Sequence, residues 1–370
     1  MADKYRIDSH KLLFHPERVA NWLSAQGSWE KLKNIYPLYM EISPVGYCNH
    51  RCTFCALDFM EYQHRQLDPT ILATRLREMA QLGLKSVMFA GEGEPTLYKP
   101  LPEILDLCSE VGIDTSLTTN MVPFTLETSK NYVKNCKWIK VSINAGTAER
   151  YAQIHRTQEK DFFRTLDNMR MCVALKKELN SKCTLGAQML LLDENADTAV
   201  ALAEKMSEIG LDYLVIKPYS QHPQSNTQKY SQINYAQLIK LNEQLQKFNT
   251  EKFKVIFRAK TMEKWDHTED RYNRCLTVPF FWGYIMSDAD VYGCSCFLGN
   301  QDFIYGNINT NTFKEIWEGE RRKKGISFME KLDSRSCRVN CRMDETNRYL
   351  WELKNPSDHV NFICNCSHLS

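Results

Sequence analysis

The chain has 370 residues, of which 43% are hydrophobic and 25% are charged, a composition typical of a soluble globular protein. Its 47 basic and 45 acidic residues give a formal net charge of +2, so it lacks the broad positive surface that binds nucleic acid or an anionic membrane. No stretch reads as a signal peptide or offers about 18 uninterrupted apolar residues. We therefore expect a cytoplasmic protein with small or specifically docked partners, and with no nucleic acid or membrane among them.

Apolar runs of strand type alternate with amphipathic stretches of helix type between residues 38 and 219. The expected strands are YMEISPV, SVMFAG, DTSLTTN, WIKVSIN, TLGAQMLLL and LDYLVIKPY, and the expected helices lie near 69–82, 101–111, 126–134, 161–179 and 197–209. Such alternation predicts a parallel sheet with helices on its outer side. Six strand–helix units are too few for the closed eightfold barrel. We therefore predict an α/β fold with a partial (β/α)6 TIM-like barrel, whose active site lies at the carboxyl ends of the strands.

The composition changes after Tyr219, where the polar segment SQHPQSNTQKYSQ precedes a helix near 234–248 and a strand near 253–258. From Cys275 onward the spacing is shorter and turn-rich, which indicates a small domain stabilised by metal rather than by a large apolar core. We expect four parts: a helical lead-in at 1–37, the partial barrel at 38–232, a connecting helix and strand at 233–274, and a cysteine-containing domain with a C-terminal tail at 275–370.

Fourteen cysteines in a chain without a signal peptide indicate metal ligation, because stable disulfides are rare in a reducing compartment. Cys48, Cys52 and Cys55 form C-x3-C-x2-C directly after the first expected strand. Three thiolates can hold three irons of a four-iron cluster and leave the fourth iron open to a non-protein ligand. The alternatives are a closed zinc site with His50 as the fourth ligand, or a set of buried free thiols.

This motif resembles that of the radical S-adenosylmethionine (radical SAM) superfamily. The resemblance implies that the open iron of a [4Fe–4S] cluster binds the amino and carboxylate groups of S-adenosylmethionine. It also implies that an electron from the cluster cleaves this cofactor to a 5′-deoxyadenosyl radical. Phe54, just before the third cysteine, is then expected near the adenine, and the expected electron donor is a flavodoxin- or ferredoxin-type protein.

The segment GEGEP, Gly91–Pro95, follows the second expected strand and resembles the family's Gly-Gly-Glu-Pro segment, with Glu92 in place of one glycine. Gly91 and Gly93 permit close backbone approach, and Glu94 or the adjacent backbone is expected to hold the ammonium group of the cofactor. The replacement leaves open whether Glu92 or Glu94 points inward. A plain turn is the alternative for the whole segment.

Polar side chains end further expected strands, where the resemblance places contacts with the ribose and carboxylate of the cofactor. They are Thr118, Thr119 and Asn120, then Ser142 and Asn144. Gln188 and Lys217 are also at strand ends and are expected to face the substrate, with Gln188 a further candidate for cofactor binding and Lys217 a candidate catalytic residue. Hydroxyl and amide groups suit ribose because they both donate and accept hydrogen bonds. The alternatives are a helix cap for Asn120 and a structural polar network for Gln188 and Lys217. His155 and Arg156 are expected to stabilise the barrel rim.

A second set of cysteines lies downstream, at Cys275, Cys294, Cys337 and Cys341. Four thiolates close a four-iron cluster with no open position, although a structural zinc site has the same ligand count. The surrounding sequence, from IMSDADVYGC to CRVNC, resembles the auxiliary-cluster domain of the SPASM and twitch branches of the superfamily. These four cysteines fit the version with one auxiliary [4Fe–4S] cluster, and Cys296, Cys364 and Cys366 are left over.

Two radical reactions are compatible with one auxiliary cluster. In the first, a hydrogen atom leaves a carbinol carbon, a base removes the hydroxyl proton, and the auxiliary cluster accepts the remaining electron. This resembles the cyclitol dehydrogenases of aminoglycoside pathways. In the second, a thiol returns hydrogen to the opposite face of the substrate and inverts a stereocentre. Cys296 is the candidate donor, because in an extended segment it shares a sheet face with Cys294. Alternatively, it is a spare thiol or replaces Cys294 as a ligand.

The expected substrate is a sugar, an aminocyclitol or a nucleotide-linked sugar. Lys217, His222, Asp288 and Arg258 are candidates for the base by location. Peptide maturation is the principal rival, but only 47 residues precede Cys48, and they do not read as the winged-helix domain with which many relatives bind leader peptides. A non-catalytic iron–sulfur or zinc scaffold is the other alternative, and it predicts no need for polar groups at successive strand ends.

Overall fold

The computed structural model describes residues 4–7, 9–264, 271–358 and 360–361. Its strands are β1 (Tyr39–Ile42), β2 (Ser86–Phe89), β3 (Asp114–Thr119), β4 (Cys136–Ser142), β5 (Thr184–Leu191), β6 (Tyr213–Pro218), β7 (Lys254–Phe257), β8 (Trp282–Ile285), β9 (Asp290–Tyr292) and β10 (Ile304–Asn307). In the described residues they form one sheet in the order β10–β9–β8–β1–β2–β3–β4–β5–β6–β7. The strands from β8 to β7 in this order are parallel, whereas β9 and β10 pair in antiparallel fashion.

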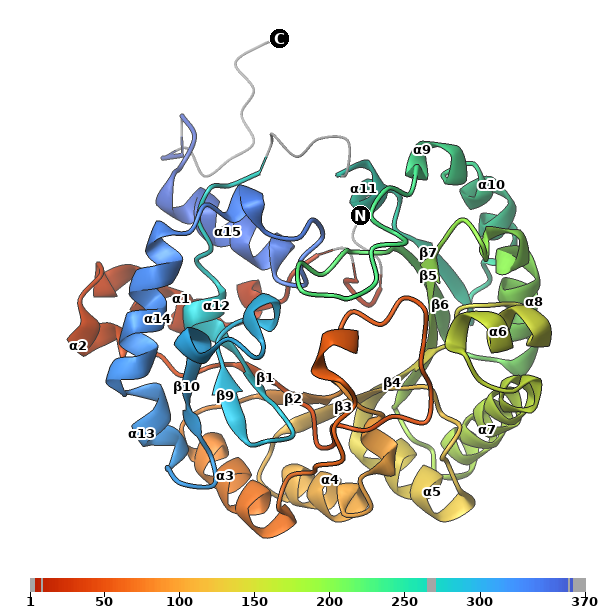
Figure 1. The fold of residues 1–370 in the computed structure, drawn as a ribbon, viewed down its shortest axis with the longest axis horizontal. Coiled ribbons are helices and arrows are strands. Elements are labelled where there is room, and N and C mark those ends of the chain that lie inside the picture. Colours follow the sequence, from red (N-terminus) through yellow and green to blue (C-terminus); the bar gives the residue numbers. More distant parts are fainter. Residues whose placement is uncertain (1–3, 8, 265–270, 359, 362–370) are drawn as a thin grey trace.

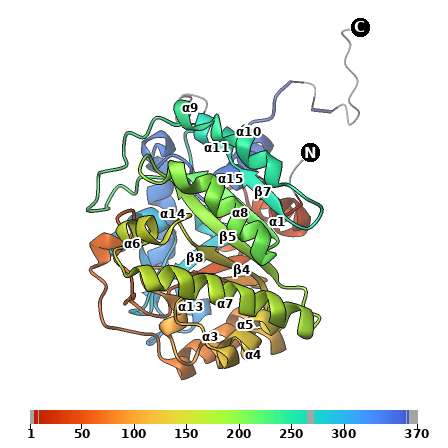
Figure 2. The same ribbon diagram turned by 90° about the vertical axis from the view of Figure 1, so that its right-hand side faces the viewer.

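Helices cover the outer side of the curved sheet (Figures 1 and 2). They are α1 (Pro16–Ala25), α2 (Trp29–Leu32), α3 (Pro69–Gln81), α4 (Leu101–Glu110), α5 (Leu126–Asn135), α6 (Ala148–His155), α7 (Glu159–Glu178), α8 (Ala199–Ile209), α9 (Tyr235–Leu238), α10 (Leu241–Leu245), α11 (Ala259–Glu263), α12 (Val278–Phe281), α13 (Phe313–Trp317), α14 (Glu320–Lys331) and α15 (Asp344–Lys354). None of these described helices is long and apolar enough to cross a membrane.

The two faces of the strands carry different side chains, because successive residues of a strand point to opposite sides. In β4, Ile139 and Val141 are at most 2% exposed and belong to the main apolar core between sheet and helices. Lys140 and Ser142 alternate with them and therefore lie on the inner face of the barrel. Lys217 takes the same inner position in β6. Polar groups thus gather on the inner face.

An apolar cluster fills the inner face where β6 begins. Tyr213, Val215 and Ile256 pack there with Tyr5 and Ile7 of the N-terminal segment, and the rings of Tyr5 and Tyr213 lie 5.0 Å apart. This packing leaves the part of the inner face nearer the carboxyl ends of the strands for polar groups and ligands.

The predicted α/β fold with an open, partial barrel is confirmed, but the sheet is wider than six strands. The strand expected near 253–258 is β7, which pairs with β6, while β8 pairs with β1 on the other side. The sheet stays open because β7 and β8 are not neighbours in it. Both added strands lie outside residues 38–232, and the division of the chain into four parts remains a prediction.

The helix expected near 234–248 is broken into α9, α10 and a 3-10 turn at Gln246–Phe248. Tyr235 and Leu245 are the two buried residues of this stretch. Short helical turns therefore suffice to bury these two side chains, and the segment does not form one continuous helix.

Candidate active site

Three thiols gather on the loop that follows β1, which we name the cluster loop (residues 45–66); Figure 1 shows it in orange inside the ring of strands and helices. Burial raises the pKa of Cys48 to about 12, and the charges of Glu94 and Cys55 add to the rise. Burial also raises the pKa of Cys52, with further contributions from Cys55 and Cys48. None of the three is in a disulfide. Three half-buried cysteines whose thiols act on one another form a soft donor set, which suits iron in a cluster.

The spacing of the donor atoms argues against a single zinc ion. Within the described residues, His50, Cys52 and His155 form the one group of three ligand-type side chains whose donor atoms all lie within 4.8 Å of one another. The sulfurs of Cys48, Cys52 and Cys55 therefore do not all lie within this distance. A tetrahedral zinc ion with Zn–S bonds of about 2.3 Å needs sulfurs about 3.8 Å apart. At least one pair of these sulfurs is thus too far apart for one zinc ion, whereas in a four-iron cluster each thiolate binds a different iron.

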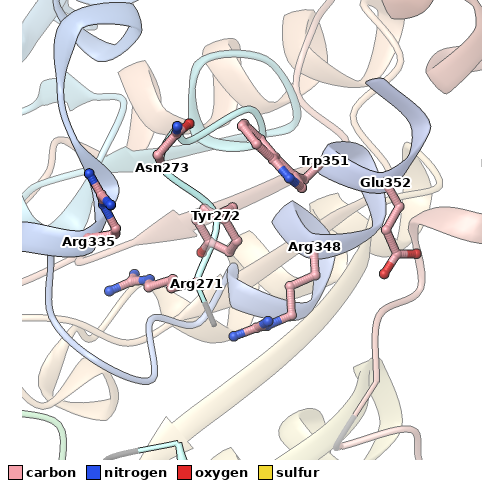
Figure 3. Close-up of a pocket in the computed structure, with 7 residues that line it drawn as sticks. All are labelled: Arg271, Tyr272, Asn273, Arg335, Arg348, Trp351 and Glu352. Atoms are coloured by element: carbon pink, nitrogen blue, oxygen red, sulfur yellow. The ribbon is translucent and has the colours of Figure 1, made fainter. Parts of the chain in front are cut away.

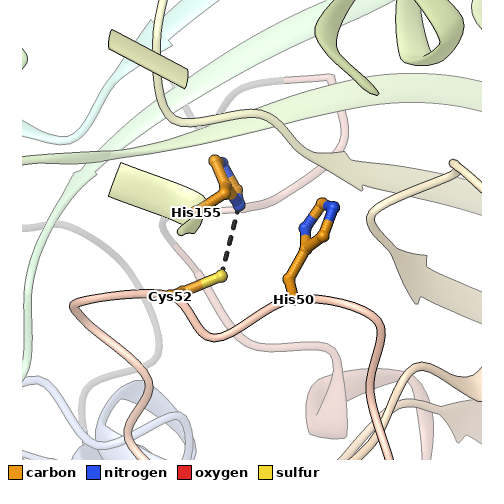
Figure 4. A group of neighbouring side chains, drawn as sticks. All are labelled: His50, Cys52 and His155. Atoms are coloured by element: carbon orange, nitrogen blue, oxygen red, sulfur yellow. Dashed lines mark hydrogen bonds between the residues drawn. The ribbon is translucent and has the colours of Figure 1, made fainter. Parts of the chain in front are cut away.

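His155 donates a hydrogen bond to one of these thiols (Figure 4). Its Nε2 lies 3.3 Å from the backbone N–H of Asn144, and since a backbone N–H can only donate, Nε2 carries no proton. Nδ1 therefore carries the proton, and it lies 3.2 Å from Sγ of Cys52. Burial lowers the pKa of His155 well below its ordinary value, so the ring stays neutral. With both nitrogens engaged in this way, His155 has no lone pair left for a metal ion.

The cluster loop is fixed by segments that are distant in the sequence. The amide of Thr53 donates to the carbonyl oxygen of Ile154 at 2.8 Å. The Asp58 carboxylate accepts hydrogen bonds from the hydroxyl of Ser225 at 2.9 Å and from the amide of Asn226 at 2.8 Å. The polar segment after β6 therefore packs on the cluster loop instead of extending into solvent.

Two glycines let the segment after β2 press against the cluster loop. A Cβ atom on Gly93 would lie 2.5 Å from the carbonyl oxygen of Val45 and closer still to that of Tyr47. Gly91 has φ of +129°, a conformation that side chains disfavour. This close approach allows the amide of Glu94 to donate to the Tyr47 carbonyl at 3.0 Å. Both glycines are therefore needed to seat the segment on the loop that carries the thiols.

Glu94 is buried and turned toward the thiols. Its carboxylate accepts hydrogen bonds from the Thr119 hydroxyl at 2.6 Å and from the Asn120 amide at 2.8 Å. Burial raises the pKa of Glu94, while these hydrogen bonds act in the opposite direction. Its charge in turn contributes to the raised pKa values of Cys48 and Cys52. A positively charged ligand group beside Glu94 would offset the cost of burying this carboxylate.

Glu92 has different partners from Glu94. They bear on the question of which of the two glutamates points inward. Its carboxylate accepts from the Ser287 amide at 3.0 Å and pairs with Nη2 of Arg65 at 3.1 Å. Glu92 thereby ties the end of β2 to the turn between β8 and β9. Of the two glutamates, Glu94 is the one that faces the thiols.

Asn120 and Asn144 use their side-chain amides within the protein. Asn120 donates to the side chain of Asn49 in the cluster loop at 2.7 Å and accepts from the amide of Val122 at 3.0 Å. Asn144 accepts from the amide of Leu190 at 2.7 Å. These contacts join the end of β3 to the cluster loop and the end of β4 to β5.

Ser142 and Gln188 are neighbours in register, and their side chains form no hydrogen bond within the described part of the chain. They remain available to a ligand on the inner face. Phe54 meets the ring of His155 edge-on, with 5.6 Å between ring centroids, and packs with Ile154 in a small apolar cluster. Phe54 thus lies beside the thiol loop, at the edge of the same site.

Two of the four candidate bases are held by other protein groups. The ring of His222 donates from Nε2 to the carbonyl oxygen of Ser295 at 2.9 Å and accepts at Nδ1 from a backbone amide at 3.1 Å. Asp288 pairs with Arg65 at 3.1 Å. The side chain of Lys217, by contrast, forms no hydrogen bond or ion pair with the residues that the structure describes.

A second group of thiols contains Cys275, Cys294, Cys296, Cys337 and Cys341. A hydrogen bond between Cys294 and Cys296 lowers the pKa of Cys296 and raises that of Cys294. Burial, followed by the charge of Cys296, raises the pKa of Cys337 and of Cys341. Burial raises the pKa of Cys275 to about 12, with Cys341 and Cys337 among the further causes. The group therefore includes Cys296 together with the four cysteines expected from the sequence.

The expectation that Cys294 and Cys296 lie on an extended segment is wrong. Ser295–Phe297 forms a 3-10 turn, and this turn brings the two sulfurs together instead of a shared strand face. Cys364 and Cys366, which the sequence left over, lie outside the described residues.

A separate hollow of about 340 Å³ lies on the C-terminal part of the chain (Figure 3). It is lined by Arg271, Tyr272, Asn273, Arg335, Arg348, Trp351 and Glu352. Arg271 donates to the carbonyl oxygen of Cys337 at 2.9 Å, so the hollow borders the second thiol group. None of the strand-end residues predicted to bind the cofactor lines it.

Comparison with known protein families gives two matches. The radical SAM superfamily matches residues 42–216, and an iron–sulfur cluster-binding domain named SPASM matches residues 275–342. A nucleotide dehydratase of Lacinutrix mariniflava, which depends on S-adenosylmethionine, is 31% identical over 114 residues, covering 30% of this chain and 24% of that protein. A probable GTP 3′,8-cyclase of Pyrococcus abyssi is 32% identical over 111 residues, covering 30% of this chain and 35% of the cyclase. The chain thus spans about a quarter and about a third of these relatives.

Solved structures share the fold over most of the chain. Streptococcus suis SuiB bound to its precursor peptide SuiA has a TM-score of 0.63 at 21% identity, with 85% of this chain and 71% of SuiB covered. The enzyme anSMEcpe with bound AdoMet has a TM-score of 0.57 at 18% identity, with 86% of this chain and 95% of that chain covered. At these identities the likeness concerns the fold alone.

Proposed function

The chain belongs to the radical SAM superfamily and carries a C-terminal SPASM domain, and from this premise we propose that it oxidises an alcohol carbon of a small polar substrate to a ketone. S-Adenosylmethionine and iron–sulfur clusters are its cofactors. When bound, they supply a radical that removes a hydrogen atom and an acceptor for the electron that remains. The favoured substrate is a sugar, an aminocyclitol or a nucleotide-linked sugar, and the electron donor is a flavodoxin- or ferredoxin-type protein.

Cys48, Cys52 and Cys55 hold the [4Fe–4S] cluster that takes the cofactor. The spacing of the thiols supports this assignment, because it is too wide for a single zinc ion. Glu94 binds the ammonium group of the cofactor, since it is a buried carboxylate turned toward the same thiols.

The remaining strand-end residues divide into two roles. Ser142 and Gln188 contact the cofactor, because their side chains face the inside of the barrel without protein partners in the described chain. Thr119, Asn120 and Asn144 position Glu94 and the cluster loop through the hydrogen bonds described above.

One auxiliary [4Fe–4S] cluster is held by Cys275, Cys337, Cys341 and one member of the pair Cys294 and Cys296. The burial of Cys296 in the same cluster as Cys294 is the observation that favours oxidation over epimerisation. Cys296 is 5% exposed and acts on the other auxiliary thiols, whereas a hydrogen donor must reach the substrate. With four cysteine ligands, the auxiliary cluster has no open iron and is available as an electron acceptor.

Lys217 accepts the hydroxyl proton in this proposal. It lies on the inner face, and burial together with the charge of Lys140 lowers its pKa well below the ordinary value. A neutral amine near physiological pH is an effective proton acceptor. The hydrogen bonds of His222 and the ion pair of Asp288 make those two side chains less available.

The experiment uses anaerobically reconstituted protein with dithionite, S-adenosylmethionine and candidate alcohols deuterated at the carbinol carbon. We expect deuterium in 5′-deoxyadenosine and one ketone for each 5′-deoxyadenosine formed. Replacement Cys296→Ala separates the two reactions when iron analysis shows that the auxiliary cluster is retained: an epimerase would lose product but keep forming 5′-deoxyadenosine, whereas the oxidation would continue. A parallel incubation with a peptide in place of the alcohol tests the alternative of peptide maturation, because SuiB was solved with a precursor peptide. Absence of 5′-deoxyadenosine under all conditions would refute an enzymatic role.

A further inference from the structure

Positively charged side chains gather between the inner face of the barrel and the loop of the second thiol group. They are Lys140 of β4, Lys217 of β6, Arg258 after β7, and Arg338 and Arg342 of that loop. The four charged groups that act most strongly on Lys217 are the other four members of this set. Glu41 of β1 is the carboxylate among the strongest charged neighbours of Lys140.

The two loop arginines reach across to the barrel strands. Nε of Arg338 donates to the hydroxyl of Ser220, just after β6, at 3.0 Å. Arg342 forms an ion pair with buried Glu41, and its Nη1 lies 3.8 Å from Sδ of Met88 in β2. The loop that carries the auxiliary ligands therefore places two guanidinium groups at the inner face.

Short contacts connect Arg342 to the first of the two lysines. The Thr118 hydroxyl lies 3.5 Å from the Met88 sulfur that Arg342 contacts, and Thr118 pairs in register with Lys140. The ammonium group of Lys140 lies 5.4 Å from the centre of the Trp138 ring. Within the described residues Lys140 forms no ion pair, and Glu41, the carboxylate among its strongest charged neighbours, pairs with Arg342.

The charge of this set is unbalanced even when Arg258 is set aside. Arg342 pairs with Glu41, whereas Lys140, Lys217 and Arg338 have no ion pair in the part of the chain that the structure describes. Burial, followed by the charge of Arg342, lowers the pKa of Lys140 to about 7. Such mutual repulsion destabilises a folded protein, and clusters of this kind are typical of sites that bind an oppositely charged ligand.

The negative charge of an iron–sulfur centre accounts for only part of this set. Arg338 and Arg342 directly follow Cys337 and Cys341, so a cluster bound there would offset some of their charge. Lys140 and Lys217 are different, because no thiol is among the strongest charged neighbours of either lysine. A bound anion would instead favour the protonated, charged form of Lys140.

We propose that Lys140, Arg338 and Arg342 form an anion seat that binds a phosphate group of the substrate, with Lys217 beside it. The inference rests on the proposed function and narrows its substrate class. Guanidinium and ammonium groups suit phosphate oxygens, so the seat selects a phosphorylated or nucleotide-linked sugar over a neutral sugar or a cationic aminocyclitol. Binding energy from the phosphate then positions the reacting carbon.

Titration calorimetry with pyrophosphate tests the seat without turnover. The protein is anaerobic, loaded with its clusters and saturated with S-adenosylmethionine, and no reductant is present. We expect pyrophosphate to bind, and Lys140→Met and Arg338→Met each to weaken binding at least about tenfold, in line with loss of one charge-assisted contact. Lys177→Met removes an exposed cation from α7 and is the matched control, with unchanged binding expected.

The contribution of Arg342 needs a double variant. Arg342→Met alone would leave the buried carboxylate of Glu41 without its ion pair, so Arg342→Met is combined with Glu41→Gln.

Further experiments distinguish a nucleotide-linked from a simple phosphorylated ligand, and they test the anion seat separately from the proposed oxidation. UDP and glucose 1-phosphate distinguish a nucleotide-linked from a simple phosphorylated substrate. Binding of pyrophosphate only in the absence of S-adenosylmethionine would overturn the seat, because the cations would then serve the cofactor carboxylate. Equal binding by the wild type and by Lys140→Met and Arg338→Met would also overturn it. Ketone formation from an uncharged sugar without any phosphate binding would retain the proposed oxidation and reject the seat.

Discussion

The two thiol groups of the molecule differ in number and in the charge around them. The first has three thiols and a buried carboxylate, Glu94, turned toward them. The second has five thiols, one more than a closed cluster needs, and two arginines that follow its ligands. Because a missing fourth thiolate leaves an iron open and a fourth thiolate closes it, the first group suits cofactor binding and the second suits electron transfer. Ligand count and neighbouring charge together set this division of roles.

Replacement Cys48→Ala tests the difference most strongly. We expect the loss of about four irons per chain and the complete loss of 5′-deoxyadenosine formation, because two thiolates do not hold a site-differentiated cluster. The auxiliary cluster should remain. Iron analysis and product chromatography measure both effects, and Cys172→Ala, at a buried thiol of α7 outside both groups, serves as the control.

The pair Cys294 and Cys296 sharpens the role of the second group. We expect one alanine variant of the pair to lose about four irons per chain and the other to keep them, because a closed cluster takes four thiolates from five. Iron and sulfide counts on the two variants decide which thiol is the ligand. Loss of the cluster in both variants, or in neither, would contradict a single auxiliary cluster with four cysteine ligands.

The two glutamates of GEGEP separate cofactor binding from structural support. Glu94→Gln removes a charge-assisted contact worth about 1.5–3 kcal/mol, so the affinity for S-adenosylmethionine should fall roughly 10- to 100-fold. Glu92→Gln changes a side chain that contacts Ser287 and Arg65, and we expect the affinity to stay nearly constant. Equilibrium binding to the oxidised protein compares the two variants, and equal losses would argue against a cofactor role for Glu94.

We expect His155 to be a positioning residue for a cluster bound by Cys48, Cys52 and Cys55, because it contacts Cys52 alone among these three thiols. An N–H···S hydrogen bond stabilises the reduced state of a cluster, so His155→Phe should make the reduction potential of the first cluster more negative and leave the auxiliary cluster unchanged. His155→Gln, which keeps an N–H donor, should restore part of the shift. Potentiometric titrations followed by electron paramagnetic resonance give both potentials. Identical potentials in the wild type and His155→Phe would show that the contact has no electronic effect.

Removing the Lys140 cation from the inner face of the barrel should stabilise the protein slightly. Lys140 has a pKa of about 7 in the folded state, below its ordinary value, so the unfolded chain binds the extra proton more strongly. Lys140→Met should therefore raise the melting temperature by about 2 °C below pH 7, corresponding to roughly 1 kcal/mol, and the gain should disappear as the pH rises toward about 10. Calorimetric melting from pH 6 to pH 10 measures the trend. A lower melting temperature at pH 6 would mean that Lys140 has an anionic partner in the free protein.

Much of the fold and of the candidate site follows from local sequence signals. The alternation of strand and helix patterns predicted the open α/β barrel, since each unit carries its own apolar period. Both cysteine motifs were visible because their spacing is short or their surrounding text is distinctive. The extra strands β7 and β8 were not assigned to the barrel, because their pairing with β6 and β1 depends on contacts between segments far apart in the chain.

The dependence on contacts between distant segments also explains which features of the site could not be predicted from the sequence. The contact between His155 and Cys52 joins positions 103 residues apart, and no local pattern marks it. The choice between Glu92 and Glu94 depended on partners in other loops. The net charge of +2 excluded a broad basic surface but gave no sign of the cations gathered on the inner face. Composition reports a sum over the chain, whereas a binding site depends on where the charges lie.

The open iron of the first cluster is tested most directly by electron–nuclear double resonance on reduced protein with S-adenosylmethionine labelled with 15N at its amino group. A variant that carries alanine at Cys275, Cys337 and Cys341 leaves the first cluster as the source of the signal. We predict a 15N coupling that shows the amino nitrogen bound to the cluster. A spectrum without this coupling, and unchanged by the cofactor, would contradict an iron held open by three thiolates.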